Sequence, residues 1–258
     1  MVYLRDNPPA RSQYRSPRRS TPSGVVVLHS TESLPDVNPP DTGSDQVAKF
    51  IRSRSDPGSY HFLCDSDSYL QLVRLGDEAF HDGTGTNSHS IGISGAYRAH
   101  QFASLPRWWR MGCIRQMALA AREAAEYVLL HTGTVIPPRR ITVTQARNGE
   151  PGFVTHGMLD PHRRSDPDGT NTGARFPWAD FFAHYTPPGD LIMDDEAREA
   201  FKELRQILTF QQSQLVNLHD KLEGIEGRQV PEATVRADIR TTRNIAEKVG
   251  AEISSTED

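Results

Sequence analysis

A short run of branched apolar residues, Val25-Val26-Val27-Leu28, constrains the fold more than any other part of the sequence. The run does not alternate with polar residues, and turn-forming residues precede it, which is typical of a β-strand buried on both faces of its sheet. Other apolar segments predict further strands at Ser59–Leu63, Tyr69–Val73, Ser90–Ser94 and Ile141–Gln145.

A helix is predicted at Gly112–His131 between these strands. Apolar residues recur there at spacings of three and four, and Gly133 follows as a stop signal. Strands interspersed with helices indicate one α/β domain, which we place at residues 24–188 because a Pro/Gly break follows at residues 185–189.

The two flanks of this domain differ from it in composition. Residues 1–23 are rich in Pro, Arg and Ser and lack periodicity, so we expect a disordered basic arm. From residue 189 to 258, apolar residues follow a heptad, break near Gly227 and resume, which predicts an α-helical hairpin or a coiled coil. These helices could form a homodimer, pack back on the domain, or bind another partner.

Composition and charge exclude several classes of protein. Two cysteines cannot build a disulfide framework or a four-cysteine zinc site. A net charge of −4 argues against a dedicated nucleic-acid binder. Apolar runs are too short to span a bilayer, so no membrane insertion is expected. The first twenty residues lack an apolar core, so we expect no signal peptide and synthesis in a cytoplasm.

Three residues are candidates for a metal centre. His29 directly follows the buried strand, and His156 and Asp166 flank a basic, proline-containing loop. Two imidazoles and one carboxylate, with a fourth position left open, are typical of a catalytic zinc site. A histidine at a strand end is commonplace and a charged loop is usually solvated, but the combination favours a metal site.

Several short segments together resemble a known family. In chain order they are Val27-Leu28-His29-Ser30-Thr31, Ser59-Tyr60-His61-Phe62, Phe80-His81-Asp82-Gly83, Asn87, Ser90-Ile91-Gly92-Ile93, His156, Arg164-Ser165-Asp166-Pro167 and Phe176-Pro177-Trp178. The chain resembles zinc-dependent N-acetylmuramoyl-L-alanine amidases of the type 2 amidase and peptidoglycan-recognition-protein fold, most closely the amidase endolysins of tailed phages. The resemblance covers roughly residues 24–185.

The resemblance implies a mixed central β-sheet flanked by helices, with Zn²⁺ held by His29, His156 and Asp166. Some phage members carry Cys at the third position. Neither cysteine of this chain lies in that loop, which supports Asp166. His81 and Asn87 are the residues that the resemblance places in contact with substrate.

Two departures from the family pattern bear on catalysis. Some members carry a catalytic Glu where this chain has Ser94, while the phage subgroup uses a Tyr at the position of Tyr60. Tyr60 is therefore the candidate for orienting water or stabilising the transition state. Arg164 stands where Lys is usual, and because its pKa exceeds about 12 it could stabilise an oxyanion but not donate a proton.

The implied function is that of a phage endolysin, which hydrolyses the amide bond between N-acetylmuramic acid and L-alanine in bacterial peptidoglycan. Such an enzyme would occupy the host cytoplasm before lysis and act on the cell wall afterwards. The alternative is a non-catalytic peptidoglycan-binding protein of the recognition-protein fold, such as relatives that have lost zinc ligands.

Overall fold

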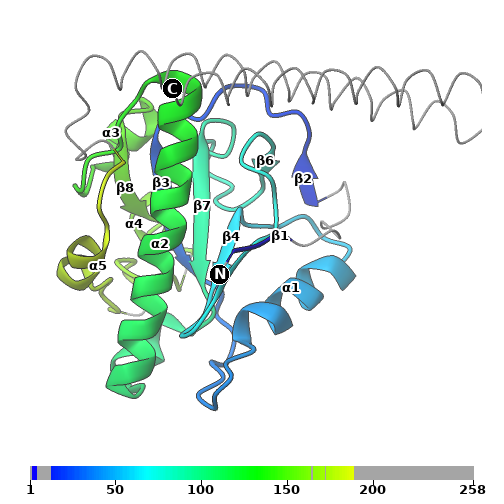
Figure 1. The fold of residues 1–258 in the computed structure, drawn as a ribbon, viewed down its shortest axis with the longest axis vertical. Helices are drawn as coiled ribbons and strands as arrows, with labels where there is room; N and C mark the ends of the chain where they lie inside the picture. The colour runs from blue at the N-terminus through cyan, green and yellow to red at the C-terminus, as the bar shows by residue number, and fades with distance from the viewer. Residues whose placement is uncertain (1, 5–12, 164, 172, 189–258) are drawn as a thin grey trace, which may run out of the picture. The chain divides into compact units, whose positions relative to one another are not determined.

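The computed structural model describes residues 2–4, 13–163, 165–171 and 173–188. Its centre is a six-stranded sheet in the order β1-β5-β4-β7-β3-β8 (Figure 1). The strands are β1 (Val2–Leu4), β3 (Val25–Ser30), β4 (Phe62–Cys64), β5 (Tyr69–Gln71), β7 (Ser90–Gly95) and β8 (Gly152–Thr155). All neighbours run parallel except β4 and β5, so the sheet is mixed, as the sequence predicts.

Helices cover both faces of this sheet. The long helix α2 (Arg107–Thr132) crosses one face, and Gly133 ends it in a left-handed conformation with φ of 73°. The shorter helices are α1 (Gly43–Ser53), α3 (Val143–Arg147), α4 (His156–Leu159) and α5 (Trp178–His184), with a 3₁₀ helix η2 at Ala99–Ser104. None of the described helices combines the length and hydrophobicity that crossing a bilayer requires.

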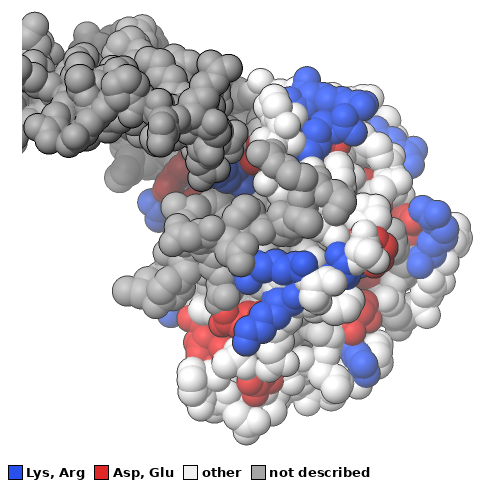
Figure 2. Space-filling view, turned by 90° about the vertical axis from the view of Figure 1, so that its right-hand side faces the viewer, with Lys and Arg blue, Asp and Glu red and all other residues white. Residues whose placement is uncertain are grey.

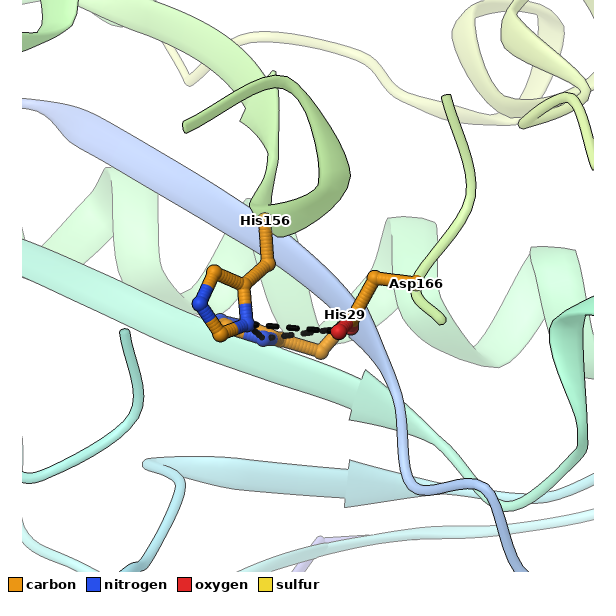
Figure 3. Close-up of side chains that lie close together, drawn as sticks. All are labelled: His29, His156 and Asp166. Carbon is orange, nitrogen blue, oxygen red and sulfur yellow. Dashed lines mark hydrogen bonds and ion pairs between the residues drawn. The ribbon is translucent and has the colours of Figure 1, made fainter. Parts of the chain in front are cut away.

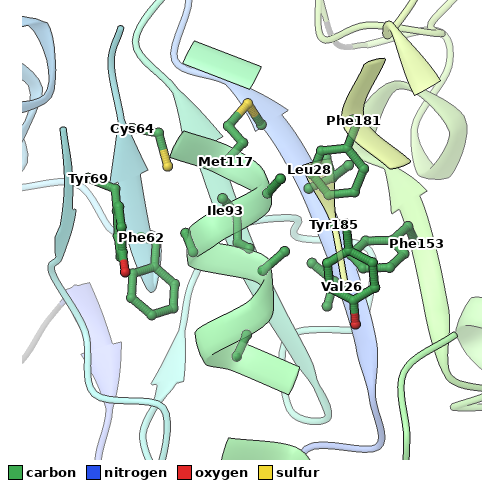
Figure 4. Packing of buried hydrophobic residues seen from close by; sticks show 14 of the residues in the cluster. Val26, Leu28, Phe62, Cys64, Tyr69, Ile93, Met117, Phe153, Phe181 and Tyr185 are labelled. Atoms are coloured by element: carbon green, nitrogen blue, oxygen red, sulfur yellow. The ribbon is translucent and has the colours of Figure 1, made fainter. Parts of the chain in front are cut away.

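The alternation of side chains along β3 decides where the functional residues lie. Val26 and Leu28 join Ile93 and Met117 in the core beneath α2 (Figure 4). Val25 and Val27 point to the opposite face and belong to a separate cluster with residues of α3 and β8. Because successive side chains of a strand alternate between faces, His29 lies on the face opposite α2. It is the fifth residue of β3, one residue beyond the end of the predicted apolar run.

The predicted strand Ile141–Gln145 is wrong, because most of that segment is helix α3. The Thr142 side chain accepts a hydrogen bond from the Gln145 backbone N–H, and the Gln145 side chain accepts one from the Thr142 N–H. This reciprocal capping box stabilises a helix start. Arg140, just before the segment, forms an isolated bridge to Phe153 of β8, and the Ile141 N–H donates to the Phe153 carbonyl oxygen at 2.8 Å.

The prediction of a disordered arm is wrong for residues 2–4 and 13–23. Strand β1 pairs with β5, and a small second sheet joins β2 (Tyr14–Arg15) to β6 (Glu78–Ala79). The Arg18 guanidinium donates to the carbonyl oxygens of Leu75, Asp77 and Ser90 at 2.5–3.1 Å. Burial lowers the pKa of Arg18 to about 10. A composition typical of disorder is here overridden by tertiary hydrogen bonds.

The described surface carries charges of both signs. Figure 2 shows Lys and Arg side chains on one face, separated by acidic and uncharged residues rather than merged into one continuous patch.

The predicted helical region 189–258, and with it the predicted homodimer, lies outside the described residues.

Candidate metal centre

His29, His156 and Asp166 come together on the sheet face opposite α2 (Figure 3). His29 projects from the carboxyl end of β3, His156 begins α4 directly after the neighbouring strand β8, and Asp166 lies in the loop that follows α4. Adjacent parallel strands end at the same edge of a sheet, which brings the two imidazoles together although 127 residues separate them. All three side chains are buried.

The separations of the three ligand atoms fit one small metal ion. The two Nδ1 atoms lie 3.1 Å apart, and the Asp166 oxygens lie 3.5 Å from His29 Nδ1 and 3.3 Å from His156 Nδ1. A tetrahedral zinc ion with ligands at about 2.0–2.1 Å requires ligand atoms roughly 3.3–3.4 Å apart. The donor set therefore fits zinc in both chemistry and spacing.

Supporting groups fix the orientation of both imidazoles. His156 Nε2 donates to the carbonyl oxygen of Asp82 at 2.9 Å, which leaves the lone pair of a neutral ring on Nδ1, facing the centre. His29 Nε2 lies 3.1 Å from His81 Nδ1, and His81 Nε2 lies 3.1 Å from Ser90 Oγ. Hydrogen bonds on the outer nitrogens of metal-binding histidines set tautomer and ring orientation in this way.

The electrostatics of the cluster favour the protonation states that a cation needs. Burial alone would raise the pKa of Asp166, but hydrogen bonds with His156 and His29 outweigh it, so the pKa lies below its usual value. Burial, followed by the charge of His156, lowers the pKa of His29 despite the opposing effect of Asp166. At neutral pH the site thus offers an ionised carboxylate and a neutral imidazole, the ligating forms of both.

Comparison with known proteins identifies the family. A sequence model described as N-acetylmuramoyl-L-alanine amidase matches residues 19–169, which include all three candidate ligands. The chain belongs to this amidase family. None of the curated proteins matches the chain.

Several solved structures are similar to this amidase-family chain. A mutant endolysin from Bacillus subtilis is 15% identical and covers 72% of this chain and 100% of its own, with a TM-score of 0.47. The catalytic domain of XlyA is 15% identical and covers 72% and 99%, with a TM-score of 0.46. The Staphylococcus aureus hydrolase AmiA, in complex with its ligand, is 14% identical and covers 71% and 80%, with a TM-score of 0.42.

Of the predicted catalytic residues of this amidase, the structure places Tyr60 beside the ligand set. Its ring centroid lies 5.2 Å from that of His29, and the side chain is half-buried just before β4. Ser94 lies opposite His29 in the β3–β7 register, is fully buried, and its Oγ has no hydrogen-bond partner among the described residues. Arg164 lies outside the described residues.

The two predicted substrate contacts have different places in the structure. His81 is buried behind His29, with both ring nitrogens engaged and its ring packed over Gly92, so the structure places it in contact with a candidate ligand, and its substrate contact stays a prediction. Asn87 Oδ1 accepts hydrogen bonds from the backbone N–H groups of His81 and Asp82. It therefore stabilises the turn that carries His81, and its side-chain oxygen is committed to that turn.

Sequence reasoning missed the residues that support the ligands. Asp82 supports His156 through its backbone carbonyl oxygen. Any residue type supplies that group, so the sequence gives no signal for it. The sequence predicts Ser90 only as part of a strand, whereas in the structure its hydroxyl contacts His81. The signal that could have found it is the parity of β7, because Ser90, Gly92 and Ser94 all point to the face of His29.

Proposed function

We propose that this chain is a zinc-dependent N-acetylmuramoyl-L-alanine amidase that hydrolyses the amide bond between the lactyl group of N-acetylmuramic acid and L-alanine in peptidoglycan. The observation that carries the proposal is the buried set of His29, His156 and Asp166, whose ligand atoms lie 3.1–3.5 Å apart. Membership of the amidase family supports the choice of this amide as the bond that is hydrolysed.

Zinc held by three protein ligands would keep a fourth coordination position for water or substrate. The ion would polarise the scissile carbonyl and lower the pKa of a bound water molecule. The chain's own contribution is to hold this arrangement rigid. His81 and the Asp82 carbonyl fix the two imidazole rings, and the backbone N–H of Ser30 donates to Asp166 Oδ1 at 3.1 Å. Such preorganisation avoids reorganisation during the reaction.

Two further residues take part in the proposed reaction. Tyr60, beside His29, orients the attacking water or stabilises the transition state through its hydroxyl group. Arg164, two residues before Asp166, stabilises the oxyanion by charge-assisted hydrogen bonds. The proton for the leaving amine comes from water or Tyr60, since both ring nitrogens of His81 are engaged.

The finer biological setting is part of the same proposal. Tyr60 before His61-Phe62, together with Ser94 in place of a Glu, is the pattern of the phage subgroup that the sequence resembles. On this basis the protein is a phage endolysin that resides in the host cytoplasm until lysis and then degrades the cell wall. Residues 189–258 would dimerise the enzyme or bind the wall or a partner.

The test uses purified cell wall and mass spectrometry of the products. Wild-type protein should release peptides with a free L-alanine amino terminus, and chelation should abolish release until zinc is restored. His156→Ala should remove the activity, while Arg122→Ala, at an exposed ion pair on α2, should retain it. Wall binding without any cleavage by the zinc-loaded wild type would overturn the proposal in favour of a peptidoglycan-binding protein.

A further inference from the structure

The loop that carries Asp166 is held by a second carboxylate two residues further on. Asp168 Oδ2 accepts a hydrogen bond from Trp178 Nε1 of α5 at 2.9 Å and from Thr155 Oγ1 of β8 at 3.4 Å. Its Oδ1 accepts from the Phe176 backbone N–H at 3.3 Å. Asp168 thus joins three segments, and one of its partners, Thr155, directly precedes the ligand His156.

The backbone at Asp168 adopts an unusual conformation that supports these contacts. Its φ is 65°, in the left-handed region that Asp and Asn tolerate better than most residues. The Asp168 N–H donates to the Ala174 carbonyl oxygen at 2.8 Å, and the Gly169 N–H lies 3.3 Å from the Asp166 carbonyl oxygen. A tight turn therefore begins at Asp166 and folds back towards residues 174–178.

The two segments that supply His156 and Asp166 touch backbone to backbone. A Cβ atom at Gly157 would lie 2.3 Å from the Pro167 carbonyl oxygen and 2.4 Å from the Gly169 nitrogen. The turn after Asp166 consequently rests directly on the residue after His156. Any shift of this turn would change the distance between the two ligands, because no side chain lies between them to absorb it.

A ligand on a loop needs such support more than a ligand on a strand. His29 is fixed by parallel hydrogen bonding of β3 to β7 and β8. Asp166 lies outside the regular elements, and loop residues retain more conformational freedom than residues of a sheet. A metal site needs its ligands within about 0.5 Å of the productive geometry.

We propose that Asp168 is a positioning residue of the metal centre, whose carboxylate clamps the turn after Asp166 onto β8 and α5 and so keeps Asp166 within ligand distance of His29 and His156. The inference rests on the proposed zinc centre. Asp168 itself is not a ligand in this arrangement, because its oxygens are engaged by Trp178, Thr155 and Phe176.

The test compares zinc affinities of the full chain by competition with a chromophoric chelator. Asp168→Asn retains the side-chain shape and tolerates the left-handed backbone, but its NH₂ group must face one of the N–H donors. Zinc affinity should fall about 10- to 100-fold, the usual cost of removing an outer partner of a ligand. Asp180→Asn makes the same charge change at an exposed position of α5 and should bind zinc like the wild type.

Two further measurements separate positioning from general stability. Cobalt(II) in place of zinc reports coordination through its visible spectrum, which should change in Asp168→Asn and resemble that of Asp166→Asn. The metal-free melting temperature is recorded for each variant, so that affinities are compared only where both proteins are folded. A purely structural role would lower the melting temperature and leave both zinc affinity and the cobalt spectrum unchanged.

The outcomes distinguish the two proposals. If the wild type binds zinc and Asp168→Asn binds it with the same affinity, only the proposed role of Asp168 is overturned. A wild type that does not bind zinc would overturn the zinc centre and the clamp together. Should Asp168→Asn fail to fold, Trp178→Phe removes only the indole donor while keeping an aromatic ring, and it should still weaken zinc binding.

Discussion

Two buried carboxylate clusters in the described part of the chain are built in opposite ways. Beside the start of α1, Asp65 accepts hydrogen bonds from the backbone N–H and hydroxyl groups of both Ser44 and Ser68. Nearby Asp41 accepts from the Gly43 N–H, from the N–H and hydroxyl of Ser66, and from Trp109 Nε1. Every oxygen of this α1 cluster faces donors.

At the metal centre, by contrast, three potential ligand atoms face one another. The two Nδ1 atoms lie 3.1 Å apart, and Asp166 lies opposite both of them. With the outer Nε2 of His156 donating to Asp82, its inner nitrogen carries a lone pair. Converging lone pairs and a carboxylate repel one another unless a proton or a metal cation lies between them, and the hydrogen bonds of the two rings with Asp166 need such a proton. A saturated carboxylate cluster therefore stabilises the fold, whereas a cluster of acceptors is a binding site.

Asp166→Asn should produce the largest effect and separates the two clusters most sharply. Losing one of three protein ligands should weaken zinc binding by roughly 4 kcal/mol, about a thousandfold, if each ligand contributes a similar share of the binding free energy. Metal-free stability should change far less than zinc affinity, because Asn keeps an oxygen for the Ser30 N–H and offers an NH₂ donor to the imidazole nitrogens. Isothermal titration with zinc and thermal melting of the metal-free protein check both parts; unaltered zinc affinity would exclude Asp166 as a ligand.

Acid should destabilise the metal-free fold through the buried histidines at and near the metal centre. Burial is the main cause of the lowered pKa values of His29, His61 and His81. Because these folded-state values lie below about 6.5, the unfolded chain binds more protons as pH falls through that value. The metal-free protein should lose up to about 1.4 kcal/mol per pH unit for each histidine below pH 6.5. Urea titrations between pH 7.5 and 5 measure this slope, and a flat profile would contradict it.

Asp65→Asn tests the α1 cluster and should reverse the pattern of Asp166→Asn. Its NH₂ group would face backbone and hydroxyl donors, so the free energy of unfolding should fall by about 2–3 kcal/mol. Zinc affinity should remain that of the wild type. Asp67→Asn is the control, since the exposed Asp67 side chain accepts only the Asp41 N–H, at 2.9 Å, within the described part of the chain, and its replacement should cost less.

Gly92→Ala should give the smallest effect and sharpens the role of the histidine behind the metal centre. A Cβ at Gly92 would lie 2.5 Å from Cγ of His81, so the His81 ring must shift and loosen its contact with His29. We expect about a tenfold loss of zinc affinity, at the lower end for an outer partner. Gly76→Ala, where the nearest atom is the flexible Tyr127 hydroxyl at 3.2 Å, is the matched control. Equal zinc binding in both variants would show that His81 does not position His29.

The parts of the structure that the sequence could predict are those with a local signal. The unbroken apolar run of β3 predicted a strand buried on both faces, and helical spacing with Gly133 predicted α2. The three clustered ligands were predicted from residue types and from a resemblance to a family. In each case the side chains themselves carry the information.

What could not be predicted depends on contacts between distant backbone atoms. The carbonyl oxygen of Asp82 supports His156, and three carbonyl oxygens hold Arg18, without constraining which residues stand there. His81 has the same side chain whether it faces substrate or supports His29. Its role follows only from the close packing over Gly92, which appears when β7 and the turn at residue 81 are placed together.

The burial of Arg18 also determines where the catalytic unit can be divided from the rest of the chain. A fragment beginning at Gly24 would lack Arg18. The carbonyl oxygens of Leu75, Asp77 and Ser90 would lose their guanidinium donor, and His61 would lose its contact with the same group. It would also remove Gln13, whose amide bridges the Arg54 and Asp56 carbonyl oxygens. A truncated or fused form of the catalytic unit should therefore begin before residue 13. This start lies well upstream of Val25, where the sequence predicts the first strand.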